Sequence, residues 1–314
     1  MDLIGENYFS FIVISKNEEM VIGECIKSIF SLGMDLSSYE VLLVDNGSTD
    51  DTLKIANEMN VQCYVEPNLK VGGLRNFAVA RSAGNVLVFL DADVVISREW
   101  FFTLLKHISN GSADCAFAPE CWYGSPTLFE RLWLNIKGLT DSSIKSVSWC
   151  QSGAFMITRE SFLISGGFNE NLSSSEDYDF GKHYSKMFTI LRDGTVYFEH
   201  LRTPKNIKSF FFQQIWHGRG SSVGFRLKGK SLYDILVHFF PLVFLILNFA
   251  YLFIFIFFFH SFTELLILII LLNFVYLILK IPQVDRYFIF YLFIIYVFLV
   301  ARGLSFIISG KRIS

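Results

Sequence analysis

Between residue 9 and about residue 200, short apolar runs alternate with longer stretches in which apolar residues recur every three or four positions. The apolar runs are bounded by turn residues and predict strands at 9–15, 39–44, 61–65, 86–90, 113–118, 153–158 and 195–198. Between them we expect helices at 17–32, 51–59, 75–83, 98–108, 159–165 and 176–187, with Asn17 capping the first. The irregular stretch 121–150 is long for a loop, so part of it should be helical. This alternation predicts an α/β fold. A polar cluster follows each of the first four strands, and we expect these clusters to lie together at one edge of the sheet.

The pattern changes in the last quarter of the chain, where Phe, Ile and Leu dominate. Residues 235–259 contain no Asp, Glu, Lys or Arg, and this stretch is long enough to cross the ~30 Å hydrocarbon core of a membrane. A second, shorter span is expected at 262–279. A third segment, 287–309, carries Arg302, which is costly at mid-bilayer. For that segment a span, a tilted helix, an interfacial helix and a re-entrant segment all stay open.

The stretch ahead of the first span mixes Lys and Arg with aromatic residues. This pattern is typical of a helix lying in a membrane interface, although an ordinary amphipathic core helix has it too. The chain therefore divides into a soluble domain at 1–204, an interfacial amphipathic segment at 205–233 and an α-helical transmembrane region at 234–314. The glycines of 218–224 lack the spacing of a phosphate-binding loop, and we expect them to let the chain bend.

Charge and cysteine content narrow the class of protein and its location. The net charge of −2 provides no bulk basic field, so a nucleic-acid partner is not expected. The five cysteines form no C-x-x-C pair and predict buried thiols in a reducing compartment. Residues 1–6 lack the features of a cleavable signal peptide. Lys and Arg precede the first span and follow the second, which predicts an integral protein of the cell (inner) membrane with its soluble domain in the cytoplasm.

Two carboxylates follow the apolar strand at 86–90. Side chains two residues apart in an extended chain lean the same way, so Asp91 and Asp93 are able to bind one hard cation, Mg²⁺ or Mn²⁺. The alternative is that an Asp after a strand only caps the next turn or helix.

Further polar residues are expected at the same sheet edge. Asp45 follows the second strand, Glu176 and Asp177 open a later helix, and His200 follows the last strand. A cation held by paired carboxylates leaves coordination positions open for a nucleoside diphosphate, which then becomes a good leaving group. A separate carboxylate could remove a proton from an attacking hydroxyl, and this role fits Asp177.

Four motifs, in this order, resemble those of the family 2 glycosyltransferases, in their membrane-anchored, bacterial polysaccharide-biosynthesis form. They are FIVISKNEE at 11–19, VDNGSTD at 44–50, FLDAD at 89–93 and SEDYD at 175–179. The resemblance covers about residues 8–225. It implies the GT-A fold, a Rossmann-like mixed sheet that serves nucleotide-diphospho-sugar transferases, here with the C-terminal membrane region attached.

The same resemblance implies roles for individual residues. Asp45 would contact the nucleotide base. Ser15, Glu18 and Arg75 would line the nucleotide-sugar pocket. Asp91 would bind the metal and the diphosphate together with Asp93. The acid pair falls on Glu176 and Asp177, with Asp177 as the base of an inverting transfer. His200 stands where many members place a His near the metal or diphosphate, and a purely structural His is the alternative.

One departure from the family concerns processivity. Processive polysaccharide synthases carry Q-x-x-R-W, whereas this chain has Gln213 followed three residues later by Trp216, with no Arg before a Trp. We therefore expect transfer of one sugar at a time.

The resulting hypothesis is an inverting, metal-dependent hexosyltransferase of cell-surface polysaccharide or glycolipid biosynthesis. It would move a sugar from a nucleotide-diphosphate donor to a lipid-linked or glycan acceptor at the cytoplasmic membrane face. Two alternatives stay open. A polyprenyl-phosphate sugar synthase would use basic residues near the interface to bind the lipid phosphate, with candidates Arg219, Arg226, Lys228 and Lys230. A non-catalytic membrane scaffold that binds a nucleotide sugar is the other.

Overall fold

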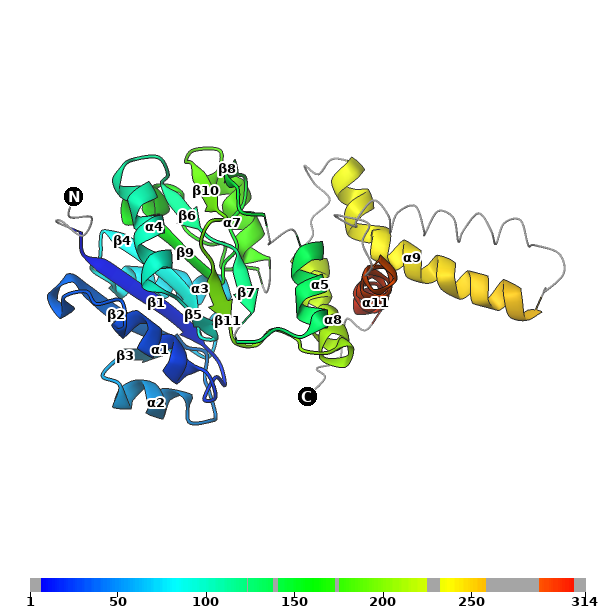
Figure 1. Cartoon of the computed structure of the whole chain (residues 1–314), viewed down its shortest axis with the longest axis horizontal. Coiled ribbons are helices and arrows are strands. Elements are labelled where there is room, and N and C mark those ends of the chain that lie inside the picture. Colours follow the sequence, from blue (N-terminus) through cyan, green and yellow to red (C-terminus); the bar gives the residue numbers. More distant parts are fainter. Residues whose placement is uncertain are drawn as a thin grey trace. The chain divides into compact units, whose positions relative to one another are not determined.

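The structure is a computed structural model of the 314-residue chain. It describes residues 7–122, 124–137, 141–172, 175–224, 232–257 and 288–307. The chain forms two compact units (Figure 1). The first comprises Met1–Ser125 and Leu139–Thr203, and the second comprises Pro126–Gly138 and Pro204–Ser314. The short segment 126–138, which the sequence pattern grouped with the soluble domain, thus belongs with the C-terminal helices.

A mixed sheet forms the centre of the first unit, as the sequence predicts. Its eight strands in the described part of the chain are ordered β3-β2-β1-β4-β9-β6-β10-β8. They are β1 (Phe9–Ser15), β2 (Tyr39–Asp45), β3 (Gln62–Val65), β4 (Val86–Asp91), β6 (Cys115–Phe117), β8 (Ile144–Val147), β9 (Ala154–Thr158) and β10 (Ile190–Asp193). The first four strands run parallel, so their carboxyl ends share one edge. Strand β9 is antiparallel to its neighbours β4 and β6, and β8 is antiparallel to β10.

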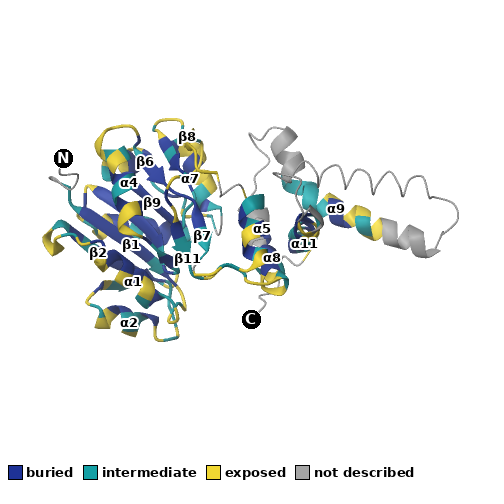
Figure 2. Ribbon diagram, viewed as in Figure 1, coloured by how far each residue is buried: buried dark blue, intermediate teal, exposed yellow. Residues whose placement is uncertain are grey.

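Helices cover both faces of this sheet. One face packs against α1 (Ile22–Phe30), α2 (Thr52–Glu58) and α4 (Arg98–Ser109), and the other against α3 (Val71–Arg81), α6 (Arg159–Ile164) and α7 (Glu176–Tyr184). The alternation of side chains along β1 explains this, because Phe9, Phe11 and Val13 enter one core and Ile12 the other. Figure 2 shows the central strands as buried. Because the sheet is buried on both faces, its strands need apolar residues at nearly every position, and these apolar runs are what predicted the strands.

A second, small sheet was missed by the sequence pattern. It consists of β5 (Val94–Val95), β11 (Phe198–His200) and β7 (Glu120–Trp122), with β11 antiparallel to β5 and parallel to β7. The last strand, predicted at 195–198, therefore lies a few residues further along, and β8 and β10 were not predicted. Strands of two to four residues are too short to show a period.

The predicted cap of the first helix is wrong. Helix α1 begins at Ile22, and Asn17 lies in a loop with φ of 56°, a left-handed conformation that Asn adopts more readily than most residues. Its side-chain oxygen accepts a hydrogen bond from the Thr49 N–H at 2.9 Å, and its own N–H donates to Ser48 Oγ at 2.8 Å. Asn17 thus joins the loop after β1 to the loop after β2.

The second unit is helical in its described residues. It contains α5 (Leu128–Ile136), α8 (Ile207–Gly224), α9 (Leu232–Phe257) and α11 (Phe288–Ile307). Helix α5 confirms the expected helical part of 121–150, and a capping box of Thr127 and Glu130 begins it. Phe210 of α8 is fully buried against α5 and α11, whereas Phe212 is exposed. One face of the predicted interfacial segment is therefore packed inside the protein.

Among the described residues, one helix is long and apolar enough to cross a membrane. It is the Phe290–Ile307 part of α11, of which 39% is buried in the structure. The predicted span at 235–259 is helical as far as Phe257 in α9. The predicted span at 262–279 lies outside the described residues. The third segment, whose form was left open, is a continuous helix in which the Arg302 guanidinium lies 5.4 Å from the centre of the Phe298 ring.

Two glycines let the helices of the second unit approach closely. Helix α8 runs through Gly218 without interruption, so the expected bend is not there. A Cβ at Gly218 would lie 2.7 Å from Ser305 Cβ on α11, and one at Gly303 would lie 2.5 Å from the Pro241 carbonyl oxygen on α9. Real Cβ atoms do not approach so closely. The helices can therefore pack at this distance only because glycine has no side chain at these two positions.

The variant Gly218→Ala should destabilise the helical unit by about 1–3 kcal/mol, because the added methyl overfills the contact with α11. Unfolding monitored by circular dichroism in detergent checks this. The double variant Gly218→Ala/Ser305→Gly removes the opposing Cβ and should recover part of the loss. An equally stable single variant would show that the two helices are not in contact at Gly218.

Candidate active site

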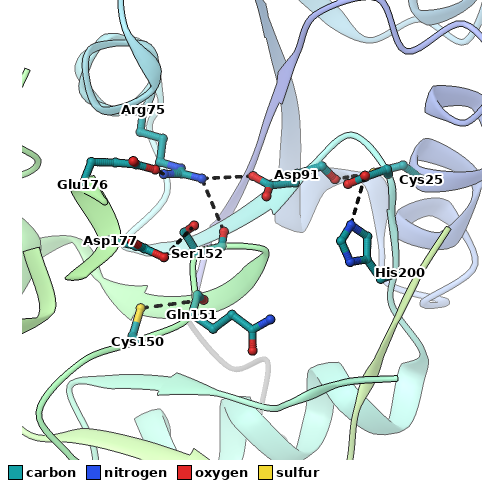
Figure 3. Close-up of polar contacts among 10 residues, drawn as sticks. Cys25, Arg75, Asp91, Cys150, Gln151, Ser152, Glu176, Asp177 and His200 are labelled. Carbon is teal, nitrogen blue, oxygen red and sulfur yellow. Dashed lines mark hydrogen bonds and ion pairs between the residues drawn. The ribbon is translucent and has the colours of Figure 1, made fainter. Parts of the chain in front are cut away.

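The candidate site lies at the carboxyl edge of the large sheet. Ser15 ends β1, Asp45 ends β2 and Asp91 ends β4, with Asp93 two residues later. The segment 150–153 enters antiparallel strand β9 at the same edge, and its Gly153 carbonyl accepts a hydrogen bond from the Asp91 N–H. Residues predicted from separate motifs are thus brought together (Figure 3).

Asp45 is held in one orientation by its neighbours. It is completely buried, and its Oδ2 accepts a hydrogen bond from Ser15 Oγ at 2.8 Å. Its Oδ1 accepts from the Ser48 N–H at 2.6 Å. The pairing of Ser15 with Asp45 in the parallel register of β1 and β2 makes this contact possible. A carboxylate fixed in this way is a rigid part of the site, and its contact with a nucleotide base stays a prediction.

Arg75 is a buried cation between two carboxylates (Figure 3). The guanidinium of this α3 residue donates from Nη1 to Glu176 Oε1 at 2.8 Å and from Nη2 to Asp91 Oδ1 at 3.0 Å. Burial lowers the Arg75 pKa, but Asp91 and Glu176 outweigh it and the pKa is raised overall. With only 2% of its surface exposed, Arg75 joins the sheet edge to the start of α7 and offers a ligand almost no surface.

Asp91 and Asp93 lie in different electrostatic surroundings. The protein around the Asp91 carboxyl removes part of its hydration, and this loss together with the nearby Asp93 raises its pKa to about 7, although Arg75 acts in the opposite direction. Burial also acts to raise the Asp93 pKa, but the hydrogen bond from His200 and its charge lower it overall. The side chain of Asp91 keeps 37% of its surface exposed, so a ligand is able to reach it. Two carboxylates that repel each other when both are ionised would be stabilised by an added cation.

The donor chemistry fits a hard divalent ion. Carboxylate oxygens are preferred ligands of Mg²⁺ and Mn²⁺, and both ions commonly complete their coordination with water and phosphate oxygens. In the part of the chain that the structure describes, no group of three or more His, Cys, Asp or Glu side chains is arranged to hold a metal by itself. A cation at Asp91 and Asp93 would therefore need ligands from outside the protein, such as a diphosphate.

His200 lies between two carboxylates. Its Nε2 is 3.0 Å from Asp93 Oδ2, and its Nδ1 is 2.9 Å from Glu120 Oε2. Burial lowers the pKa of His200, but the hydrogen bonds to Asp93 and Glu120 raise it overall to about 10. Sequence reasoning found His200 and missed Glu120. Glu120 could have been found as an acidic residue two positions after the predicted strand 113–118, in the same way as Asp91 and Asp93 were found after theirs.

Glu18 also lies in this acidic region. Burial raises its pKa to about 7, Arg202 opposes this, and Asp93 adds to it. The Arg202 guanidinium lies 2.9 Å from Glu18 Oε2. Sequence reasoning missed Arg202, which follows β11 by two residues and is separated from Glu18 by 184 positions. No local pattern would have revealed this pair.

Asp177 and Glu176 open α7 but have different partners. Glu176 is buried and bound to Arg75. Asp177 accepts a hydrogen bond from the Tyr178 N–H at 2.7 Å and one from Ser152 Oγ at 3.3 Å. Burial and the adjacent Glu176 raise the Asp177 pKa. Of the two acids, Asp177 has uncharged partners, and a raised pKa suits a group that must accept a proton.

Comparison with protein families gives a match over residues 10–166, half of the chain, to the model described as glycosyl transferase family 2. The chain belongs to glycosyltransferase family 2. Three of the motifs from which the resemblance was drawn, at 11–19, 44–50 and 89–93, lie wholly inside the matched region, whereas Glu176, Asp177 and His200 lie beyond it.

Relatives of this family 2 chain are glycosyltransferases from archaea and bacteria. Glycosyltransferase AglE of Haloferax volcanii is 32% identical over 113 residues, which cover 34% of this chain and 37% of AglE. The poly(ribitol-phosphate) β-N-acetylglucosaminyltransferase TarS of Staphylococcus aureus is 34% identical over 207 residues, 64% of this chain and 30% of TarS. The chain thus matches about a third of the length of these two relatives.

A solved structure has the same fold. The mannosyltransferase PcManGT of Pyrobaculum calidifontis, determined in complex with GDP-Man and Mn²⁺, matches with a TM-score of 0.64 at 15% identity. The match covers 99% of this family 2 chain and 90% of the mannosyltransferase. At this level of identity the likeness shows the fold, which is the predicted GT-A-like mixed α/β arrangement.

Proposed function

We propose that this family 2 protein is a metal-dependent, inverting glycosyltransferase that moves one sugar from a nucleotide-diphosphate donor to a lipid-linked or glycan acceptor. The observation that carries the proposal is the Arg75 bridge. It joins Asp91, the candidate metal and diphosphate ligand, to Glu176, the neighbour of the candidate base Asp177. One buried cation therefore fixes the two halves of a displacement reaction relative to each other.

The donor would bind along the carboxyl edge of the sheet. Asp45 is completely buried, so the nucleotide base would donate a hydrogen bond to it only if Ser48, which holds it, moved aside on donor binding. Glu18 lies in the neighbouring loop. Asp91 and Asp93 would hold Mg²⁺ or Mn²⁺, which when bound neutralises the diphosphate charge. The mannosyltransferase of the same fold was determined with a nucleotide sugar and Mn²⁺, which supports this assignment.

Asp177 would accept the proton of the acceptor hydroxyl. The hydroxyl oxygen then forms a bond to the anomeric carbon as the bond from that carbon to the diphosphate breaks, and the electron pair leaves with the nucleoside diphosphate. The Ser152 hydroxyl and the Tyr178 N–H hold the Asp177 carboxylate in place. Attack from the side opposite the leaving group inverts the anomeric configuration.

The helical unit would hold the enzyme at the cytoplasmic face of the cell (inner) membrane. The apolar window of α11 has the length of a span, and large apolar side chains are exposed on α9 and α11, namely Val243, Ile246, Phe249, Phe290, Phe293 and Ile307. Anchoring would raise the effective concentration of a lipid-linked acceptor. The phosphate-binding role considered for Arg226, Lys228 and Lys230 falls outside the described residues, as does the side chain of Arg219.

A donor screen tests the proposal. The full chain in detergent is mixed with UDP-, GDP- and dTDP-sugars and Mn²⁺ or Mg²⁺, and thermal unfolding and nucleoside diphosphate release are measured with and without EDTA. One nucleotide class should raise the unfolding temperature and, by slow transfer of its sugar to water in the absence of an acceptor, release nucleoside diphosphate; EDTA should remove both effects. Asp91→Asn/Asp93→Asn should behave like the EDTA-treated protein. A folded protein that gives neither effect with any donor would contradict the proposal and favour a scaffold.

A further inference from the structure

The small sheet brings three side chains from distant parts of the sequence to one point. Asp93 immediately precedes β5, Glu120 is the first residue of β7, and His200 is the last residue of β11. Strand β11 pairs with both of the others, with His200 opposite Val94 and Phe198 opposite Glu120. The Leu201 N–H also donates to the Asp93 carbonyl oxygen at 2.8 Å. The backbone therefore fixes the positions from which these side chains meet.

Glu120 is a buried carboxylate, with 6% of its surface exposed. Burying an ionised carboxyl group is costly unless a partner compensates for it. Its Oε2 accepts a hydrogen bond from the Nδ1 of His200 at 2.9 Å, which supplies such a partner. This bond also fixes the rotation of the imidazole ring about its side-chain axis. The opposite ring nitrogen, Nε2, is thereby directed at Asp93 Oδ2, 3.0 Å away.

This arrangement has a known use in metal sites. Carboxylates that bind a metal are themselves commonly held by hydrogen bonds from neighbouring side chains, and these outer contacts tune the affinity for the ion. In this chain the Nε2 of His200 faces Asp93, one of the two candidate metal ligands, and its Nδ1 faces Glu120. Glu120 would therefore act on His200, and His200 on the carboxylate that would bind the ion.

We propose that Glu120 is a positioning residue for the divalent cation of this enzyme. It holds the His200 ring so that Nε2 stays directed at the Asp93 carboxylate, and it thereby sets the affinity of the site for Mn²⁺ or Mg²⁺. The inference rests on the proposed function, because it requires a cation at Asp91 and Asp93.

The test is a titration of the full chain in detergent with Mn²⁺, in the presence of the nucleoside diphosphate found in the donor screen. Free Mn²⁺ is followed by electron paramagnetic resonance. Glu120→Ala should weaken Mn²⁺ binding by about tenfold, the lower end of the range for losing a partner of a metal ligand, because Glu120 acts on Asp93 through His200. Glu120→Gln retains an oxygen that accepts from Nδ1 and should lose less, about threefold, because an uncharged acceptor makes a weaker bond. Glu199→Gln removes the acid next to His200 on β11, and this variant should bind Mn²⁺ as the wild type does.

Turnover gives a second readout. For Glu120→Ala the Mn²⁺ concentration needed for half-maximal activity should rise by the same factor, and excess Mn²⁺ should restore most of the maximal rate. A residue needed only for folding would not be rescued by metal.

The outcomes separate the inference from the proposed function. A wild type that does not bind Mn²⁺ overturns both. A wild type that binds Mn²⁺ beside a folded Glu120→Ala variant of equal affinity overturns the inference alone. If Glu120→Ala does not fold, Glu120→Gln decides, since unchanged Mn²⁺ affinity in that variant also overturns it.

Discussion

Asp177→Asn should lower the rate of sugar transfer by about 100-fold or more while leaving donor binding unchanged, because the amide cannot accept the acceptor proton. The substitution keeps the shape of the side chain and an oxygen that can accept from Ser152 Oγ or the Tyr178 N–H, the two groups that hold Asp177. Steady-state transfer assays give the rate, and the donor-induced rise in unfolding temperature gives the binding.

A matched control lies two residues away. Asp179 is an exposed acid in the first turn of the same helix, where its side chain lies 3.4 Å from that of Asn169. Asp179→Asn should change the rate by less than about twofold, because an exposed charge of this kind contributes little. If Asp177→Asn transferred sugar at the wild-type rate, Asp177 would not be the base.

The pH dependence of the wild type should agree with this assignment. A base acts only when it has lost its proton, and burial together with Glu176 raises the pKa of Asp177. The rate should therefore fall on acidification, beginning at a higher pH than an ordinary exposed aspartate would give. With Mn²⁺ and donor kept at saturating concentrations, so that Asp91 stays bound to the ion, this acidic fall of the residual rate should disappear in the Asp177→Asn variant.

Local pattern was sufficient to predict the sheet edge. The strands β1, β2 and β4 are buried on both faces, so each is a run of apolar residues long enough to recognise, and each ends in a polar residue that the site uses. Asp45, Asp91 and Asp93 could be singled out for this reason. Asn17 was wrongly read as a helix cap, because the same amide that caps helices also accepts hydrogen bonds between loops.

Pairings between distant residues could not be predicted in this way. Glu120 meets His200 across 80 positions, and Arg75 meets Glu176 across 101. The strands that deliver Glu120 and His200 have three residues each and show no period. Resemblance to the family suggested that Arg75 lines the nucleotide pocket, but its burial between two acids depends on α3 and α7 covering the same face of the sheet.

The most destabilising substitution in the first unit should be Arg75→Met. Removing one partner of a buried ion pair leaves the other charges without compensation, and the usual cost is about 3–5 kcal/mol. Here Glu176 and Asp91 would both lose the guanidinium that binds them at 2.8 and 3.0 Å. For a unit of this size the unfolding temperature should fall by roughly 10 °C, as measured by thermal unfolding in the absence of metal and donor.

Two further variants identify the cause. Arg81→Met, on the same helix, removes an exposed guanidinium that stacks on Phe77, and it should cost no more than about 1 kcal/mol. The double variant Arg75→Met/Glu176→Gln removes the buried charge of Glu176 together with its partner and should recover part of the lost stability, because an uncharged amide is less costly to bury than a carboxylate. Donor binding should be weak in both Arg75→Met variants, since in each of them Asp91 lacks the cation that orients it. If Arg75→Met were as stable as Arg81→Met, the ion pairs around Arg75 would contribute nothing to the fold, and the link from Asp91 to the start of α7 would have to be made by other contacts.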